Sequence, residues 1–321
     1  MLLHRTTLLQ NGIWEHLRAE SAVVYAPRGG GKTALKRKIE ISASTDAFLS
    51  VTYNYFPTEG LKLKDIDLNY HLKNVVRSLL IAILSSATES GIDALTRDER
   101  HFLYALGKEH LSGLTKAELR EPIASVANLS VKAKEMWNRL TGVINVVMKL
   151  AALKMGFSAP EIAKFESEKL DVGATEEQLR FLVSVAAKFK FSSVYVLVDK
   201  VDENPLTGGA AASSTFIRPI LSDLSILEMR GIAFKLFLWD RTEADAKESA
   251  RPDKIRTYRL EWSRAQLKEM LAKRLQAHSA KRVHNLAQIV QVSRPLVVDD
   301  SIIDLSGGSP RNIIRICKSN R

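Results

Sequence analysis

The sequence predicts an α/β fold: a doubly wound parallel sheet, interrupted by a large helical insertion and followed by a small helical unit. Continuous apolar runs typical of buried strands alternate with stretches whose apolar residues recur every three or four positions, as on one face of a helix. The strand-like runs form two groups, one before residue 60 and one after residue 190, and helical spacing fills the interval. Such alternation favours a parallel sheet with helices packed on it.

The elements follow in order from these patterns. Apolar, β-branched runs predict strands over 23–25, 48–55, 193–198 and 232–239, and a weaker one over 255–260. Helical spacing predicts helices over 33–41, 65–88, 97–108, 116–126, 131–155, 176–188 and 265–277. Asp65, Ser130 and Ser263 suit the N-caps of three of them, and Pro310 suits the first turn of a last helix. The small, uncharged segment 207–215 predicts a mobile surface loop.

Composition excludes several classes of protein. With 45% hydrophobic and 26% charged residues, the 321-residue chain has the make-up of an ordinary globular protein. The longest uncharged apolar run, 78–87, is about half of what a bilayer span needs, and the N-terminus lacks the apolar core of a signal peptide. We therefore expect no membrane partner. The single cysteine, Cys317, rules out an intramolecular disulfide and fits a reducing compartment, so we expect a cytoplasmic protein.

The net charge of +11 is concentrated near the C-terminus, where residues 251–321 hold 15 Lys and Arg against 6 Asp and Glu. A basic segment of this kind can serve nucleic acid, an acidic partner, or arginines that bind phosphates. It can equally be a solvated helix face with surplus cations, because much of the charge falls at helical spacing around apolar residues. The sequence leaves these alternatives open.

The strongest motif is the segment 26–33, Ala-Pro-Arg-Gly-Gly-Gly-Lys-Thr, between a predicted strand and a predicted helix. It fits the phosphate-loop pattern G-x-x-x-x-G-K-[S/T] except at the first position, where Ala26 stands. Glycines let backbone N–H groups wrap a phosphate chain, and the helix N-terminus adds the positive end of its dipole. Lys32 is expected to reach the β- and γ-phosphates of ATP, and Thr33 to bind Mg²⁺. The motif therefore predicts a nucleotide site built by Arg28, Gly29, Gly30, Gly31, Lys32 and Thr33.

A phosphate loop also needs a carboxylate at the end of a neighbouring strand to hold the metal's water shell, and Asp199 ends the run 194–198. Position 200, where a second acid usually follows, is Lys200, and acids return at Asp202 and Glu203. A strand followed by D-x-h-D-E resembles the Walker B element of the signal-transducing (STAND) P-loop ATPases, notably the NACHT-like and KAP-like groups. This resemblance implies that Asp202 or Glu203 positions the attacking water. Lys200 leaves the rate of hydrolysis open.

Two arginines match further elements of the same families. Arg241 follows the strand 232–239, where STAND and AAA+ relatives place a γ-phosphate sensor. Arg311 lies in the segment 307–315, GGSPRNIIR, which resembles their lid sequence, where a helix carries a sensor arginine. The stretch 260–263 also looks like the start of a lid in origin-recognition and KAP-like ATPases. Alternatively, Arg241 begins a surface loop and Arg311 is solvated.

The resemblance divides the chain into a P-loop NTPase core at 1–64 and 180–262, a helical insertion at 65–179 and a helical lid at 263–321. Within the insertion, Met136, Trp137 and Met148 are expected to be core residues. Arg251 and Arg256 are candidates for an arginine finger of the AAA+ kind, against a solvated loop.

The function that the resemblance implies is an ATP-binding and ATP-hydrolysing switch of the STAND/AAA+ type. Such a protein changes conformation or assembles into a homo-oligomer on ATP, and bacterial relatives often serve anti-phage defence with a separate protein effector. One alternative is a nucleic-acid-binding AAA+ ATPase of the origin-recognition or transposition-regulator kind, whose binding would weaken steeply with salt. Another is a non-hydrolysing interaction module that ATP stabilises.

Overall fold

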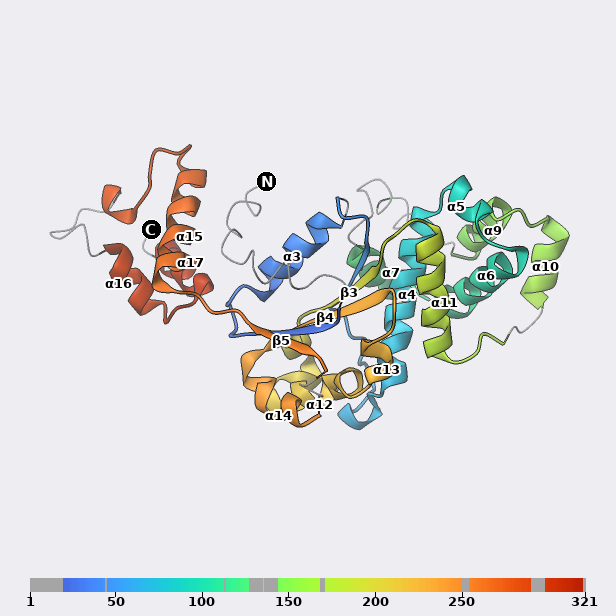
Figure 1. Ribbon diagram of the computed structural model, residues 1–321, viewed down its shortest axis with the longest axis horizontal. Helices are drawn as coiled ribbons and strands as arrows, with labels where there is room; N and C mark the ends of the chain where they lie inside the picture. The colour runs from blue at the N-terminus through green and yellow to red at the C-terminus, as the bar shows by residue number, and fades with distance from the viewer. Residues whose placement is uncertain are drawn as a thin grey trace.

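A computed structural model describes residues 20–43, 45–112, 114–126, 135, 144–167, 171–249, 254–289 and 298–319. Its centre is a sheet of five strands, all paired in parallel, in the order β2-β3-β4-β1-β5 (Figure 1). The strands are β1 (Ala22–Ala26), β2 (Leu49–Tyr53), β3 (Val194–Val198), β4 (Ile232–Trp239) and β5 (Arg256–Arg259). The predicted α/β class and parallel sheet are thereby confirmed.

The strand order determines where a site can form. Strand β4 lies between β1 and β3, with Ala26 opposite Trp239 and Val198 opposite Leu236. Because parallel strands end at the same edge, the segments that follow β1, β3 and β4 meet at the carboxyl edge of the sheet. In open α/β sheets, ligands bind at this edge.

Helices pack on both faces of the sheet. Helix α3 (Lys32–Ser42) packs its buried Leu35 and Ile39 on one face, against strand residues such as Val24 and Phe237. The opposite face carries a second apolar cluster, to which several helices contribute (Figure 1). Those helices are α4 (Leu68–Ser86), α11 (Thr175–Lys188), α12 (Ala210–Leu221), α13 (Leu224–Leu227) and α14 (Glu243–Ser249).

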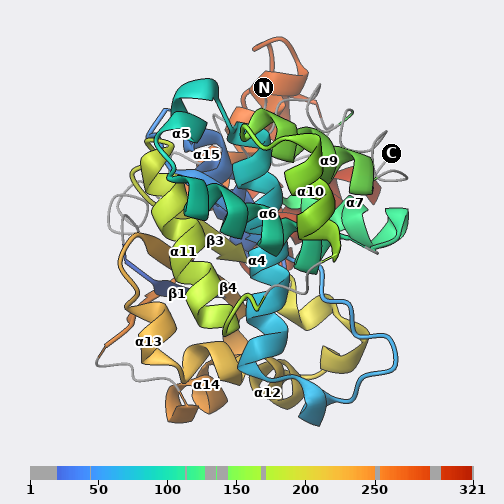
Figure 2. The ribbon, with the colours of Figure 1, turned by 90° about the vertical axis from the view of Figure 1, so that its right-hand side faces the viewer.

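The helical region between β2 and β3 shares this second cluster with the sheet. Helix α4 packs on β2 and on α11, and Figure 2 shows α4 and α11 side by side. Buried residues of α4 and of the outer helices, such as Leu79, Leu106 and Met148, belong to one apolar cluster with the strands. The outer helices are α5 (Glu89–Asp93), α6 (Arg97–Leu111), α7 (Lys116–Ser125), α9 (Ile144–Lys154) and α10 (Ala159–Ser167). Met148 is a core residue, as expected, whereas Met136, Trp137 and Ser130 lie outside the described residues.

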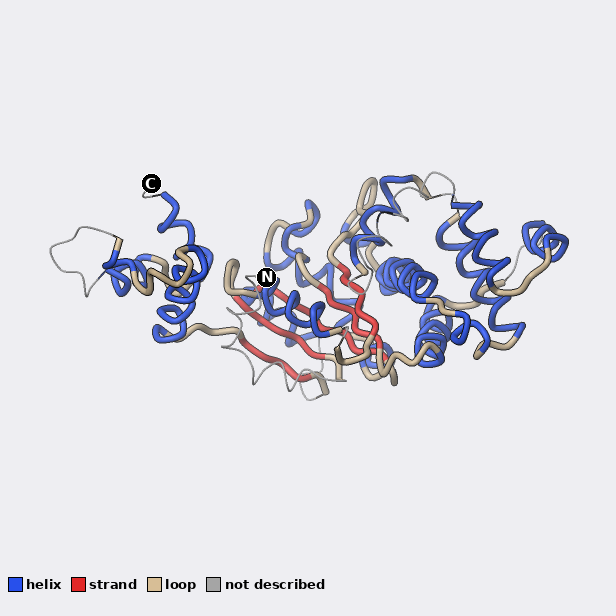
Figure 3. The backbone as a smooth tube through the Cα atoms, turned by 90° about the horizontal axis from the view of Figure 1, so that it is seen from above, coloured by secondary structure: helices blue, strands red, loops and turns tan. Residues whose placement is uncertain are grey.

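The segment after β5 forms its own helical unit at one end of the molecule, joined by an extended stretch of chain (Figures 1 and 3). It comprises α15 (Arg264–His278), α16 (Val298–Leu305) and α17 (Pro310–Ser319). A third apolar cluster, which includes Leu267, Met270 and Ile313, holds the unit together. Ser263 caps α15 by accepting a 3.2 Å hydrogen bond from the Gln266 N–H, and Pro310 begins α17, both as predicted.

Two local predictions are wrong. Asp67 rather than Asp65 caps α4, accepting a 2.7 Å bond from the Tyr70 N–H, because Asp65 belongs to the preceding 3₁₀ turn, Leu63–Asp65. The segment 207–215 is not a loop: α12 starts at Ala210, and its three alanines favour a helix. The Ser213 hydroxyl also donates a 2.9 Å bond to the carbonyl of Thr207 and so ties the first turn down.

Further 3₁₀ turns are Val201–Glu203, Pro205–Thr207, Asp240–Thr242 and Leu286–Gln288. Among the helices that the structure describes, none combines the length and the apolar character needed to cross a membrane.

Candidate nucleotide site

A cavity of about 440 Å³ opens at the carboxyl edge of the sheet, between the loop after β1, the turn after β3 and the start of α17. Most of the residues predicted for a nucleotide site line it, although they come from three distant parts of the chain. The lining residues are Pro27, Arg28, Gly29, Gly31, Lys32, Thr33, Ala34, Asp199, Lys200, Asp202, Glu203 and Arg311. Two predicted residues, Gly30 and Arg241, are not part of this lining.

The loop conformation requires glycine at two positions. Gly29 has φ +82° and Gly31 has φ +104°, values that residues with a Cβ rarely adopt. A Cβ on Gly29 would also lie only 2.8 Å from the Cβ of Arg311 and 2.9 Å from the hydroxyl of Ser309. Gly31 is the N-cap of α3, so the loop leads directly into a helix N-terminus. Exposed N–H groups and the helix dipole at that point favour an anion.

Lys32 lies at the base of the loop with its ammonium group turned to the backbone. Its Nζ donates to the carbonyl of Ala26 at 2.9 Å and to that of Pro27 at 3.4 Å. Burial lowers the pKa of Lys32, and the nearby carboxylates of Asp202, Asp199 and Asp240 oppose that shift. A cation held among backbone carbonyls and acids at the loop is suited to pair with phosphate oxygens.

Thr33 and Asp199 come together as the motif predicts. The Thr33 hydroxyl donates a 3.1 Å bond to Oδ2 of Asp199, whose Oδ1 accepts a 3.0 Å bond from the Lys200 N–H. Burial raises the pKa of Asp199, and the neighbouring Lys36 counteracts that rise.

These two oxygen donors fit Mg²⁺, which takes one or two protein ligands and completes its octahedron with water and phosphate. Within the described ranges, no cluster of three or more His, Cys, Asp or Glu could hold a metal ion by itself. A magnesium ion here would therefore depend on phosphate oxygens as further ligands.

The two acids after β3 have different surroundings. Lys200 adopts a left-handed conformation with φ 62°, which starts the turn that carries both acids. The Asp202 side chain is 8% exposed, and its Oδ2 accepts a 2.8 Å bond from Nε of Arg28. The Glu203 side chain is 58% exposed and lies 3.6 Å from Nζ of Lys200. Of the two, Glu203 is the acid more open to water.

The two predicted arginines lie against the same aromatic ring. The guanidinium of Arg28 lies 4.3 Å from the ring centroid of Trp239, and that of Arg241 lies 5.3 Å from the same ring. Arg241 is exposed and is not part of the cavity wall, but it shares the Trp239 ring with Arg28, which is.

Trp262, just before the C-terminal helical unit, is bonded to the phosphate loop. Its indole N–H donates a 2.8 Å bond to the carbonyl of Gly30, and its ring lies 3.6 Å from where a Cβ on Gly31 would stand. Trp262, Trp239 and Asp240 are site residues that sequence reasoning missed. Only their positions in the sequence could have indicated them. Trp239 ends a predicted strand, Asp240 follows it, and Trp262 precedes a predicted helix.

The finger candidate Arg256 is not among the residues that line this cavity. Arg256 lies at the amino end of β5, opposite Ala22, and pairs with Glu20 at 2.9 Å. Arg251 lies outside the described residues.

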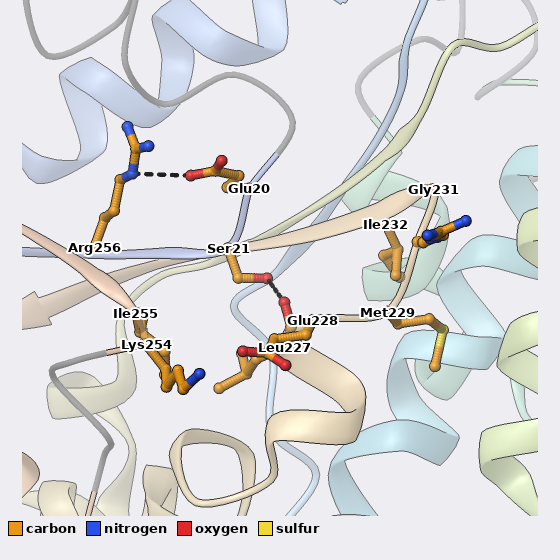
Figure 4. A pocket seen from close by; sticks show the side chains of 11 residues that line it. Glu20, Ser21, Leu227, Glu228, Met229, Gly231, Ile232, Lys254, Ile255 and Arg256 are labelled. Carbon is orange, nitrogen blue, oxygen red and sulfur yellow. Dashed lines mark hydrogen bonds and ion pairs between the residues drawn. The ribbon is translucent and has the colours of Figure 1, made fainter.

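A larger cavity of about 660 Å³ lies at the opposite, amino-terminal edge of the sheet (Figure 4). Several of its polar groups already have partners within its wall. The hydroxyl of Ser21 donates a 2.6 Å bond to the carbonyl of Leu227, and Arg256 pairs with Glu20. The described residues that line it include neither a glycine-rich loop nor a helix N-terminus with a lysine, so the carboxyl-edge cavity is the candidate functional site.

Comparison with known proteins identifies no family for this chain. No protein-family model matches the sequence, and a search of curated proteins finds no match.

Proposed function

We propose that this chain binds ATP with Mg²⁺ in the carboxyl-edge cavity and acts as a hydrolysing switch of the STAND/AAA+ type. The observation that carries the proposal is the convergence of loop, acid and lid: Lys32, Thr33 and Asp199 line one cavity with Arg311. If the segment were only a glycine-rich turn with an incidental lysine, nothing would require Asp199 to accept a hydrogen bond from Thr33, the residue after that lysine. The two residues lie 166 positions apart in the sequence.

Each residue has a role that its contacts support. The loop amides and Lys32 would hold the phosphate chain, and Thr33 and Asp199 would hold the magnesium ion. When bound, magnesium neutralises charge on the phosphate oxygens. Glu203 is the better candidate to position water, because its side chain is 58% exposed whereas Asp202 is ion-paired.

The switch would act through the lid. The start of α17 packs on Gly29, and Trp262, the residue before the lid, is bonded to Gly30, so the two contacts lie on consecutive residues of the phosphate loop. A phosphate chain that reorders this loop would change both contacts together. We propose that this coupling repositions α15 to α17 and favours assembly of the chain, with an effector protein as the further partner.

One observation favours a second candidate, a module that binds ATP without turning it over. Both acids that follow Asp199 face a cation, since Asp202 pairs with Arg28 at 2.8 Å and Glu203 lies 3.6 Å from Lys200. A carboxylate engaged in an ion pair is a weaker acceptor for water. The two candidates share the binding site and differ only in phosphate release.

The test is calorimetric titration with ATP and Mg²⁺ together with phosphate release. Lys32→Ala should weaken binding at least tenfold, since a buried cation that pairs with phosphate is lost. Arg37→Ala, which removes an exposed cation from the same helix, is the matched control and should bind as the wild type does. Equal binding by Lys32→Ala and the wild type would refute the proposed site.

Turnover and assembly need separate readouts. Phosphate release that Glu203→Gln abolishes supports the hydrolysing switch, whereas tight ATP binding without release supports the second candidate. The mass of the particle with and without ATP, measured by light scattering, tests assembly directly.

A further inference from the structure

The side chain of Arg28 makes two hydrogen bonds and one contact with an aromatic ring. Its Nε donates a 2.8 Å bond to Oδ2 of Asp202, and its Nη2 donates a 3.0 Å bond to the backbone carbonyl of the same residue. The central carbon of the guanidinium, Cζ, lies over the ring of Trp239, 4.3 Å from its centroid. The two bonds from neighbouring nitrogens to one residue fix the orientation of the group, and the ring restricts its position further.

Arg28 lines the cavity and keeps donors that the described contacts do not use. A guanidinium carries five N–H donors, and its contacts with the described residues use two of them. The side chain is 49% exposed and lines the same cavity as Lys32 and Thr33. Three fixed donors beside a glycine-rich loop match the geometry with which arginine binds phosphate oxygens.

Asp202 is buried behind this arginine. Its side chain is 8% exposed, and it lies on a turn that Lys200 starts in a left-handed conformation. An acid that is so enclosed and so paired is poorly arranged to polarise water, but well arranged to hold a cation in place.

We propose that Asp202 acts through Arg28: together with Trp239 it is a positioning residue that presents the free donors of the guanidinium to the phosphates of the bound nucleotide. This inference rests on the proposed function, since it assumes that ATP binds in the cavity. It assigns the two acids different roles, with Asp202 orienting Arg28 and Glu203 facing water. Preorganisation of this kind raises affinity by removing the cost of ordering a long side chain on binding.

A double-mutant cycle tests the inference. The affinity for ATP with Mg²⁺ is measured by calorimetry for the wild type, Asp202→Ala, Arg28→Ala and the double variant. Asp202→Ala should weaken binding about fivefold when Arg28 is present, the typical effect of freeing one long side chain, and should have no further effect in the Arg28→Ala background. Trp239→Leu should show the same dependence on Arg28.

The conservative variant separates positioning from catalysis. The amide oxygen of Asp202→Asn can still accept from Nε of Arg28, so this variant should keep most of the affinity and most of the turnover. If Asp202 positioned the water instead, Asp202→Asn would bind ATP normally and lose kcat, which would overturn the inference. Urea unfolding of each variant, with Arg37→Ala as the folded control, tests whether a change in affinity or turnover is caused by loss of structure.

Two other outcomes overturn the inference. An increase in affinity on Asp202→Ala would mean that the acid and the phosphates compete for Arg28. An equal loss in both backgrounds would mean that Asp202 acts without Arg28. Failure of the wild type to bind ATP would overturn the proposed function as well, and so differs from these two results, in which ATP still binds.

Discussion

The indole N–H of Trp262 donates a 2.8 Å hydrogen bond to the carbonyl oxygen of Gly30, so the residue before the lid is bonded to the phosphate loop. Gly30 in turn donates its own N–H to the carbonyl of Pro27 at 2.9 Å, which closes the turn of the loop. Gly30 is thus bonded both to Trp262 and, within the loop, to Pro27. Any rearrangement of the loop must alter this bond or carry Trp262 with it.

Trp262→Phe should loosen the lid while keeping an aromatic ring against Gly31. The lost hydrogen bond is worth about 1 kcal/mol, so the free energy of unfolding should fall by roughly that amount. Amide exchange should become faster at the start of α15 and at the beginning of α3. Urea unfolding and hydrogen exchange measured by mass spectrometry provide the two readouts. Unchanged exchange in both segments would show that the bond does not couple them.

Gly29→Ala should disturb the contact between the loop and α17. The residue has φ +82°, and a Cβ would lie 2.8 Å from the Cβ of Arg311, a part of the chain that cannot simply rotate away. Strain in the loop together with this overlap should cost roughly 1–3 kcal/mol and weaken ATP binding.

Gly208→Ala is the matched control for that change. Nothing lies within 4 Å of a Cβ at Gly208, and its φ of −61° is one that alanine adopts freely. Thermal unfolding and ATP titration of both variants are compared. An equal effect of the two substitutions would show that the contact with Arg311 is irrelevant to Gly29.

The central sheet and most residues of the carboxyl-edge cavity could be predicted from the sequence because both depend on local patterns. The run 194–198 is apolar at every position, as a strand covered on both faces must be, and Asp199 marks its end. The segment 26–33 combines glycines, a lysine and a threonine at fixed offsets, and these offsets determine the loop. Parallel pairing then brings Thr33 and Asp199 together at one edge, although they lie far apart in sequence.

Other features depend on contacts that no local pattern encodes. The three alanines after Gly209 fit a loop or a helix, and the bond from Ser213 to Thr207, which secures the helix, requires the folded chain. The same holds for Trp239, whose ring contacts Arg28 only because β4 adjoins β1. The packing of α4 against the sheet was missed for a similar reason, since helical spacing shows an apolar face and not what covers it.

The buried Lys235 should make the stability of the protein depend on pH. It lies in the middle of β4, fully buried, with its Nζ 5.0 Å from the ring centroid of Tyr195 and bonded to the carbonyl of Glu20. Burial lowers its pKa from 10.5 to about 7. Between these values the unfolded chain binds a proton that the folded protein does not, so stability rises as the pH increases from about 7 to 10.5.

Replacing this lysine with an apolar residue of similar length should therefore stabilise the protein most at low pH. The shift corresponds to a burial cost on the order of 5 kcal/mol, present in full below about pH 7 and absent above pH 10.5. Lys235→Met should recover part of it, roughly 1–4 kcal/mol at pH 6.5, and much less at pH 10. Urea unfolding at both values measures the gain, with the exposed Lys154→Met as the control. A gain of the same size at pH 6.5 and pH 10 would mean that the packing of methionine, and not the removal of a buried charge, is what stabilises the variant.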